Sequence, residues 1–530
     1  MSKIITIFLT VLTLTACTFI KQEQDAGKKA EAEIAKKMSE WCEQKSTLDE
    51  ETRITVEVLL ERAGTKNCKQ ASQRLSNLTK LYLSEDNISD LRPISDLTYL
   101  TELDLSNNNI SNLAPLSKLT NLTHLTLWGN QITDIKPLIK LTNLAELKIP
   151  PQSFIWWCEH QAIIPKKTKH TVEVLLKEAG TEDCKQANQK LNELITIVLD
   201  NKEISDLQPL SSLTNLKSLF LGNNQIKDIK PLSTLTNLIK IELDNNQIKD
   251  IESLSTLNNL IILRLGQNQI SDIKPLFSLT NLTELNLRNN KLSNIKGLAK
   301  LTNLTKLNLD SNLLTDLKEF DFLGKFTKLT RLSLNDNKIS DIKPILTLTN
   351  VKYLELNNNS ISNLEGLDSL NNLTWLQLKN NSIGDLKPLS KLNNLKILVL
   401  QNNKISDLEP LSNLTNLTDI NLEQNQISDL IPLSRLIKLT RLYAGQNLIN
   451  DLKPLSNLTN LRSLKLWRNQ ISNIKPLSNL INLYSLELSE NEISDLKPLS
   501  NLTNLNHLIL SENPIEDKTC PLQSVSVCAF

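Results

Sequence analysis

The stretch LKSLFLGNNQIKDIKPLSTLTN (Leu216–Asn237) is followed without a gap by LIKIELDNNQIKDIESLSTLNN (Leu238–Asn259). Both have leucine, isoleucine and asparagine at the same places, so the pattern has a period of 22 residues. A fixed period of this size indicates stacked structural repeats. The chain has 530 residues, which is also too long for one ordinary hydrophobic core.

An asparagine within the pattern LxLxxNxI marks each repeat. After residue 190 the markers are Asn224, Asn246, Asn268, Asn290, Asn312, Asn337, Asn359, Asn381, Asn403, Asn425, Asn447, Asn469, Asn491 and Asn513. One interval is 25 residues long, because KEFDFLGKFTKL (318–329) replaces a shorter phrase. Asn108 and Asn130 mark earlier repeats, and Asp86 and Lys202 hold the marker position at the start of each array. The sequence therefore predicts three marked repeats, an interruption, and fifteen more.

Each part of the repeat predicts a local structure. The alternation in LxL predicts a short strand whose leucines face inward. A buried asparagine after the strand can bond to the backbone of adjacent coils with both its carbonyl and its amide, so stacked asparagines should form a ladder. The proline of DIKPL suits the first turn of a short helical segment. We predict an α/β solenoid with parallel strands on its concave face and 3-10 or irregular structure on its convex side.

The pattern L..LxLxxNxIxDIxPLxxLTN resembles the 22-residue leucine-rich repeat of bacterial internalins. The resemblance covers about 400 of the 530 residues. It implies a leucine-rich repeat solenoid that recognises a protein ligand, usually on the concave side. The chain lacks the LPxTG sorting motif and the immunoglobulin-like segment of internalins, so the resemblance does not imply a role in host-cell invasion.

The interruption FIWWCEHQ (154–161) is explained by a duplication. Residues 41–100 shifted by 116 fall on residues 157–216 without a gap. TVEVLLERAGTKNCKQASQRL (55–75) then matches TVEVLLKEAGTEDCKQANQKL (171–191), and both copies predict two helices. Gly64 and Gly180 are expected to end the first helix, and Thr65 and Thr181 to cap the second. Because an open solenoid end exposes core leucines and strand edges, each copy is predicted to cover the first coil of an array.

The cysteines indicate an exported protein. Apart from Cys17, six cysteines form three sequence-local pairs, and two of the pairs have the same 26-residue spacing. Disulfides persist outside the cytosol, and the duplicated spacing favours three bonds. The predicted bonds are Cys42–Cys68, Cys158–Cys184 and Cys520–Cys528. Zinc binding is the weaker alternative, because there is no CxxC and the four histidines lack ligand spacing.

The start of the chain has the form of a secretory signal. Lys3 precedes an apolar run from Ile4 to Leu14, which is too short to span a membrane. LTAC (14–17) resembles a bacterial lipobox, which implies cleavage before Cys17 and acylation of that cysteine. Ordinary signal cleavage, leaving a free Cys17 thiol, is the alternative. Lipidation predicts an exported protein anchored to a membrane, with the outer membrane or cell surface favoured by Thr18.

These observations divide the chain into seven segments. The predicted boundaries are 1–16 for the lipoprotein signal peptide, 17–40 for a tether that passes into a short helix, 41–76 for the first helical N-terminal cap, 77–151 for the short repeat array, 152–192 for the second helical cap, 193–513 for the long repeat array and 514–530 for a C-terminal disulfide cap.

Nothing in the sequence predicts catalysis or a cofactor. The acidic residues recur with the repeat, and GxGxxG, GxSxG and HExxH motifs do not occur. With 59 basic and 58 acidic residues, the formal net charge of +1 gives no reason to expect nucleic-acid binding. We therefore predict neither an enzyme nor a metal site.

The outward positions of the strands are the surface that could bind a partner. In the long array they hold Phe220, Tyr353, Trp375, Tyr443 and Trp467, although only 4% of the chain is aromatic. Aromatic residues and arginine are frequent among interface hot spots. The predicted partner-binding residues are Arg331, Tyr353, Trp375, Lys379, Ile397, Val399, Tyr443 and Trp467.

Two alternatives remain open from the sequence. The aromatic side chains could be scattered, and cross-strand stacking alone could account for them. The favoured function is a membrane-anchored module that binds a protein, and a glycan ligand is also possible. The alternative function is a structural or polysaccharide-binding protein of the cell envelope.

Overall fold

The computed structural model of the chain describes residues 28–149, 152–315, 318–522 and 527–530. The predicted signal peptide and Cys17 lie outside these residues. The chain divides into two compact units, Met1–Leu194 with Ile204–Thr214, and Ile195–Glu203 with Asn215–Phe530.

Among the described residues, all strand pairing is parallel and the strands form two sheets. The first sheet contains β1 (Lys80–Tyr82), β2 (Glu102–Asp104), β3 (His124–Thr126) and β4 (Glu146–Lys148). The second sheet has sixteen strands. They are β5 (Thr196–Val198), β6 (Ser218–Phe220), β7 (Lys240–Glu242), β8 (Ile262–Arg264), β9 (Glu284–Asn286), β10 (Lys306–Asn308), β11 (Arg331–Ser333), β12 (Tyr353–Glu355), β13 (Trp375–Gln377), β14 (Ile397–Val399), β15 (Asp419–Asn421), β16 (Arg441–Tyr443), β17 (Ser463–Lys465), β18 (Ser485–Glu487), β19 (His507–Ile509) and β20 (Cys528–Ala529).

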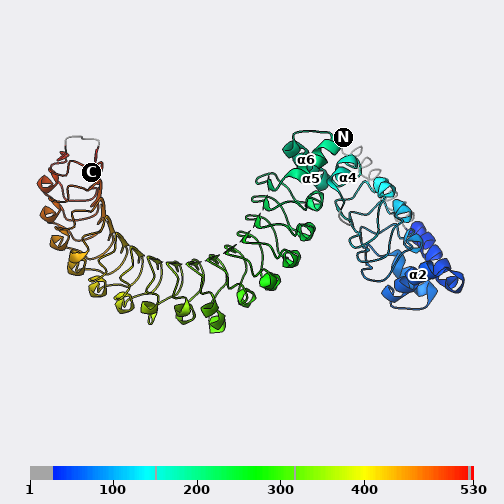
Figure 1. The fold of residues 1–530 in the computed structure, drawn as a ribbon, viewed down its shortest axis with the longest axis horizontal. Helices are drawn as coiled ribbons and strands as arrows, with labels where there is room; N and C mark the ends of the chain where they lie inside the picture. The colour runs from blue at the N-terminus through cyan, green and yellow to red at the C-terminus, as the bar shows by residue number, and fades with distance from the viewer. Residues whose placement is uncertain (1–27, 150–151, 316–317, 523–526) are drawn as a thin grey trace, which may run out of the picture. The chain divides into compact units, whose positions relative to one another are not determined.

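Short 3-10 helices return the chain from one strand to the next. They are η2 (Arg92–Ile94), η3 (Ala114–Lys118), η4 (Lys136–Lys140), η5 (Gln208–Leu210), η6 (Lys230–Thr234), η7 (Glu252–Thr256), η8 (Lys274–Ser278), η9 (Lys296–Leu298), η10 (Lys318–Lys325), η11 (Lys343–Thr347), η12 (Leu367–Ser369), η13 (Lys387–Leu389), η14 (Glu409–Leu411), η15 (Ile431–Arg435), η16 (Lys453–Leu455), η17 (Lys475–Leu477) and η18 (Lys497–Leu499). In the long array these helices lie on the outer side of the arc and the strands on its inner side (Figure 1). The predicted leucine-rich repeat solenoid is confirmed.

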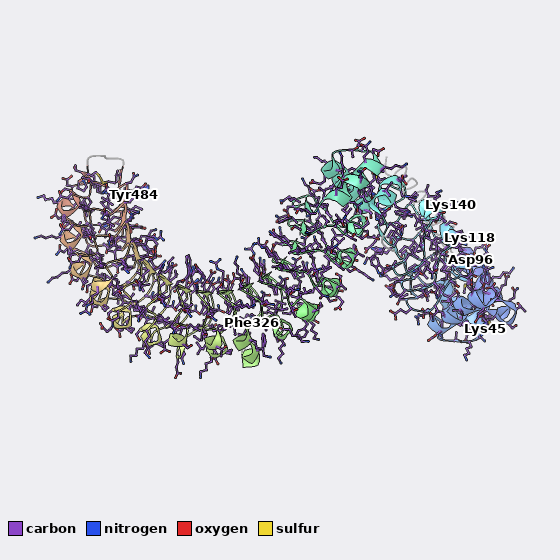
Figure 2. The ribbon with its side chains drawn as sticks, viewed as in Figure 1. Lys45, Asp96, Lys118, Lys140, Phe326 and Tyr484 are labelled. Carbon is purple, nitrogen blue, oxygen red and sulfur yellow. A yellow bond between two sulfur atoms is a disulfide. The ribbon has the colours of Figure 1, made fainter. Side chains whose placement is uncertain are left out.

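The 25-residue repeat leaves the sheet undisturbed. Strand β10 pairs with β11 in the register Lys306↔Arg331, as in neighbouring repeats. The additional residues lengthen η10, which follows β10 on the outer side of the arc. Phe326, 1% exposed, fills the core beside this helix (Figure 2).

The core is built from stacked columns of leucine and isoleucine. Leu219, Ile241 and Leu263, the central residues of β6, β7 and β8, pair in register and are fully buried. Full burial of such a side chain stabilises the fold by about 1.5–3 kcal/mol. One coil cannot bury these side chains alone, so each coil depends on its neighbours.

The predicted asparagine ladder is present. The Asn246 side-chain amide donates to the carbonyl of Leu221 at 2.9 Å and to that of Leu243 at 3.1 Å. Its carbonyl accepts from the backbone N–H of Ile226 at 3.0 Å. Each marker therefore bonds both to its own coil and to the preceding coil.

A helical cap precedes each of the two repeat arrays, and both caps belong to the first compact unit. The first contains a helix through residues 28–43, η1 (Lys45–Thr47), α2 (Glu50–Arg62) and α3 (Cys68–Ser76), and the second contains α4 (Phe154–Glu159), α5 (Lys166–Ala179) and α6 (Cys184–Glu193). The structure contains the predicted disulfides Cys42–Cys68 and Cys158–Cys184. Gly64 and Gly180 adopt φ angles of +63° and +64° where α2 and α5 end, which confirms their predicted role.

Two expectations about the caps need correction. Residues 28–40 belong to a helix of the first cap rather than to a tether, because Ile34 and Met38 are buried. Lys37 of this helix lies 3.6 Å from Asp96, a residue of the first repeat array. The short helix expected at the end of the tether is therefore an amphipathic part of the first cap.

The second correction concerns the N-caps of α3 and α6. Asn67 and Asp183 fill these positions, and their side chains accept from the backbone N–H groups three residues later. Thr65 and Thr181 lie two residues further upstream and accept from the backbone N–H of Asn67 and Asp183. The threonines therefore support the capping residues instead of capping the helices themselves.

The coil that follows the second cap closes the edge of the first sheet. The Gln208 side chain accepts from the backbone N–H of Ile149 at 3.0 Å and donates to the carbonyl of Leu147. One buried amide thus satisfies backbone groups beside β4, as the next strand of a sheet would do. In the first array the residue equivalent to Gln208 is Arg92, whose guanidinium pairs with Asp90 at 2.7 Å.

The C-terminal segment adds a strand that we did not expect. Cys528 of β20 pairs with Leu508 of β19, and the predicted disulfide joins Cys520 to Cys528. The disulfide loop therefore extends the sheet by one short strand.

Candidate protein-interaction surface

The sheet register aligns four of the predicted partner-binding residues. Arg331, Tyr353, Trp375 and Ile397 begin the consecutive strands β11 to β14 and pair directly with one another. Val399 ends β14 beside Gln377. We call these five residues the aromatic strip.

The members of the aromatic strip contact each other as well as solvent. The Arg331 guanidinium carbon lies 4.7 Å from the centre of the Tyr353 ring. The rings of Tyr353 and Trp375 are 6.4 Å apart with an interplanar angle of 43°. Both rings and Ile397 are half-buried, while Arg331 is exposed. Such cation–π and aromatic contacts orient the side chains before a partner arrives.

Trp375 has an unusual polar environment. Its indole N–H is buried and has no hydrogen-bond partner among the described residues. An unsatisfied buried donor costs about 1–3 kcal/mol, so this indole does not reach its most favourable hydrogen-bonding state in the free chain.

Lys379 lies on the same rung as Trp375, as predicted. Its backbone N–H donates to the side-chain carbonyl of Asn357 at 2.8 Å, and its side chain is half-buried. It therefore lies beside the aromatic strip.

Tyr443 and Trp467 form a separate patch. Strand β15 lies between the aromatic strip and the strand of Tyr443. Asp419, which starts β15, is ion-paired with Arg441. The Lys465 ammonium lies 5.4 Å from the Tyr443 ring, and Trp467 donates its indole N–H to Glu423 at 3.0 Å. The structure therefore places the predicted residues in two clusters.

A chain of ion pairs lies on the other side of the aromatic strip. Glu242 contacts Lys240 at 2.9 Å and Arg264 at 3.3 Å, and Glu284 contacts Arg264 at 2.8 Å and Lys306 at 3.2 Å. Burial opposes ionisation of Glu284, but its hydrogen bonds to the two cations outweigh burial and lower its pKa. This network of ion pairs was not predicted from the sequence. The sequence feature that could have predicted it is the alternation of basic and acidic residues at the outward positions of β7 to β10.

A shallow hollow of about 380 Å³ joins the ion-pair chain to the aromatic strip. The short side chains of Asn308 and Ser333 lie within it, and Arg264, Arg331 and Glu355 border it. The Glu355 carboxylate accepts from Ser333 at 3.1 Å. The surface thus offers an apolar strip next to a polar recess.

The described residues contain no cluster of His, Cys, Asp or Glu suited to a metal ion. Among the same residues, no helix has the length and apolar character required to cross a bilayer.

Comparison with known proteins identifies the class. The family model for leucine-rich repeats (two copies) matches residues 76–118, 192–235, 236–278, 280–322, 327–369, 371–413, 393–435 and 437–479, more than half of the chain. The chain belongs to the leucine-rich repeat family, whose solenoids typically serve as binding surfaces. A search of curated proteins gives no significant match.

Solved structures place the repeats within the internalin type. An internalin, InlF of Listeria monocytogenes, is 33% identical with a TM-score of 0.55, and the match covers 66% of this chain and 95% of InlF. The functional domain of Listeria InlJ is 24% identical with a TM-score of 0.57, covering 69% and 77% of the two chains. A leucine-rich repeat protein of Leptospira interrogans is 26% identical with a TM-score of 0.50, covering 78% and 97%.

Proposed function

We propose that this chain is a membrane-anchored lipoprotein that binds a protein partner through the concave face of its long array. The observation that carries this proposal is the aromatic strip, in which Arg331, Tyr353, Trp375 and Ile397 align on consecutive strands. Tyrosine, tryptophan and arginine are the residue types most enriched in interface hot spots.

The surroundings of the strip also suit a protein partner. The polar hollow and the paired charges of Arg264, Glu284 and Lys306 lie beside the strip. Protein interfaces commonly combine an aromatic centre with a polar rim. Because the strip residues contact each other in the free chain, less side-chain entropy is lost on binding.

Membrane anchoring rests on the lipobox-like LTAC sequence ending at Cys17. Acylation of Cys17 would attach the chain to the outer membrane or cell surface. Cys17→Ser should move the protein from the membrane fraction to the soluble fraction and abolish labelling with a fatty-acid analogue. Retention of both properties in the variant contradicts the anchor.

Partner binding is tested with purified chain crosslinked to the surface of intact cells. The double variant Tyr353→Ala/Trp375→Ala should recover the captured protein at least ~30-fold less efficiently, because hot-spot truncation typically costs about 2 kcal/mol or more. Tyr484→Ala is the matched control, since Tyr484 is an exposed aromatic residue of the same array outside the strip (Figure 2).

The same capture experiment distinguishes protein binding from the alternative function, polysaccharide binding. If binding survives protease treatment of the cells and purified envelope polysaccharide captures the chain, the protein is polysaccharide-binding. Equal protein capture by the double variant and the wild type contradicts the proposed site. Absence of a cofactor, of enzymatic activity and of nucleic-acid binding remains a prediction from sequence.

A further inference from the structure

Trp467 lies flat across the neighbouring coil. A Cβ atom placed on Gly445 would come within 2.2 Å of the Trp467 Nε1 atom and within 2.6 Å of its Cε2. The indole therefore rests against the Gly445 backbone, and only glycine leaves room for it there. Trp467 is half-buried, so its remaining exposure belongs to the rest of the ring and to the face opposite Gly445.

Glu423 fixes the indole from two coils away. Its Oε1 accepts from the Trp467 indole N–H at 3.0 Å. Its Oε2 accepts from the Asn421 side-chain amide at 3.3 Å, and its backbone N–H donates to the Asn421 side-chain Oδ1 at 3.0 Å. Tryptophan and carboxylate are thus held in place in the free chain. We call Glu423, Gly445 and Trp467 the Trp467 platform.

Three other aromatic rings at outward strand positions already hold a cation of this chain. Lys240 lies 4.5 Å from the Phe220 ring, and Lys465 lies 5.4 Å from the Tyr443 ring. Arg331 occupies the Tyr353 ring in the same way. Within the described residues no lysine or arginine occupies the Trp467 ring. Arg468, the next residue, is directed to Glu490 at 3.6 Å.

The platform has the electrostatic character of a cation site. The face of an indole is negative and is the strongest aromatic acceptor of a cation. Donation of the indole N–H to a carboxylate increases the electron density of the ring, and the Glu423 carboxylate adds its own negative charge nearby. Charge complementarity therefore favours a cationic ligand over a neutral one.

We infer that the Trp467 platform seats a lysine or arginine side chain of the protein partner. The inference rests on the proposed function and gives the partner a defined feature. The partner would place its cation over the exposed indole face, near Glu423. A carbohydrate stacked on the indole is the competing outcome.

The first experiment does not require the partner. The full chain is labelled with 5-fluorotryptophan, and its six tryptophan resonances are observed by fluorine NMR. Trp467→Phe assigns the resonance of interest. N-acetyl-arginine N-methylamide is titrated into the labelled chain, and the neutral, isosteric citrulline derivative is titrated in a parallel experiment at matched ionic strength. The arginine derivative should shift the Trp467 resonance, and the citrulline derivative should not.

Glu423→Gln is the decisive variant, because glutamine can still accept from the indole N–H but has no charge. It should reduce the arginine-induced shift about two- to five-fold, which is the range of one exposed cation–π or ion-pair contact. It should weaken partner capture by the same factor. Equal shifts with both derivatives, no shift of Trp467, or an unchanged response in Glu423→Gln overturns the inference. A shift with oligosaccharides alone assigns the platform to carbohydrate instead.

The two proposals fail in different ways. If the aromatic-strip variants abolish capture while Trp467 ignores the arginine derivative, only the cation seat is wrong. If Trp467 responds as expected but the cells yield no captured protein, the proposed function is wrong, and with it the assignment of the cation to a protein partner.

Discussion

Asn268 of the asparagine ladder provides a quantitative test of how the coils hold together. Its side-chain carbonyl accepts from the buried backbone N–H of Ile248 at 3.0 Å. Its amide donates to the carbonyls of Leu243 at 3.0 Å and Leu265 at 3.1 Å. We consider the substitution Asn268→Ala, which removes all of these bonds.

The free energy of unfolding lost in Asn268→Ala depends on which backbone groups keep a hydrogen-bond partner. The carbonyl of Leu243 keeps a bond from Asn246, and that of Leu265 keeps one from Asn290. The N–H of Ile248 loses its side-chain acceptor, and an unsatisfied buried donor costs about 1–3 kcal/mol. With a smaller loss from the two shared carbonyls, we expect the local stability to fall by about 2–4 kcal/mol.

Hydrogen exchange followed by mass spectrometry measures the loss of stability coil by coil. A local measurement is needed because a long repeat array need not unfold in two states. Amides around Ile248 should exchange about 30- to 1,000-fold faster, and the change should fade within neighbouring coils. Asn259→Ala is the control, because Asn259 is exposed and bonds only the carbonyl of Thr236 among the described contacts. If the two variants exchange alike around Ile248, the ladder does not stabilise the array as argued.

Two further predictions concern Asp206 and Gln208, which follow the second cap in the chain and belong to the first compact unit. Burial raises the pKa of the Asp206 carboxyl, although hydrogen bonds from its neighbours oppose this shift. The stability that Asp206 contributes is therefore present below its unfolded pKa and is lost as the pH rises through its folded pKa. Asp206→Asn should therefore raise the melting temperature of this unit at pH 7, and the gain should shrink towards pH 4. Asp90→Asn is the comparison, and it should lower the melting temperature because it removes an ion pair with Arg92. An effect of Asp206→Asn that does not change with pH refutes the reasoning. Gln208→Ala should expose the edge of the first sheet and accelerate exchange of the Ile149 amide by about tenfold or more, and unchanged exchange there contradicts the edge-closing role.

The repeat made most of the fold predictable. The period of 22 places one inward pair of leucines in each coil, and stacking is the only arrangement that buries them all. The markers, the proline-initiated 3-10 helices and the disulfides followed because each depends on a local pattern. The duplicated cap was visible in the shift of 116 residues between Cys42 and Cys158.

Other features depend on contacts between coils and were harder to predict. Trp467 and Gly445 are one period apart, and only the register reveals that one fills the space above the other. A second set of asparagines was also missed. Asn358 donates to Asp336 at 2.6 Å and Asn402 donates to Asn380 at 2.9 Å along the exposed edge.

These residues precede the markers and have positive φ angles, for example 56° at Asn358. Asparagine tolerates this left-handed conformation better than most residues, which explains the repeated NN pairs. The signal was therefore present in the sequence, but its meaning depended on knowing the turn geometry.

Quantitative capture of a surface protein from intact cells by the wild type, Tyr353→Ala/Trp375→Ala and Tyr484→Ala tests the central claim most directly. The account predicts that the first and third capture the same protein equally, and that the double variant loses at least ~30-fold while its melting temperature stays within a few degrees. Undiminished capture by the folded double variant would contradict the claim that the aromatic strip binds the partner.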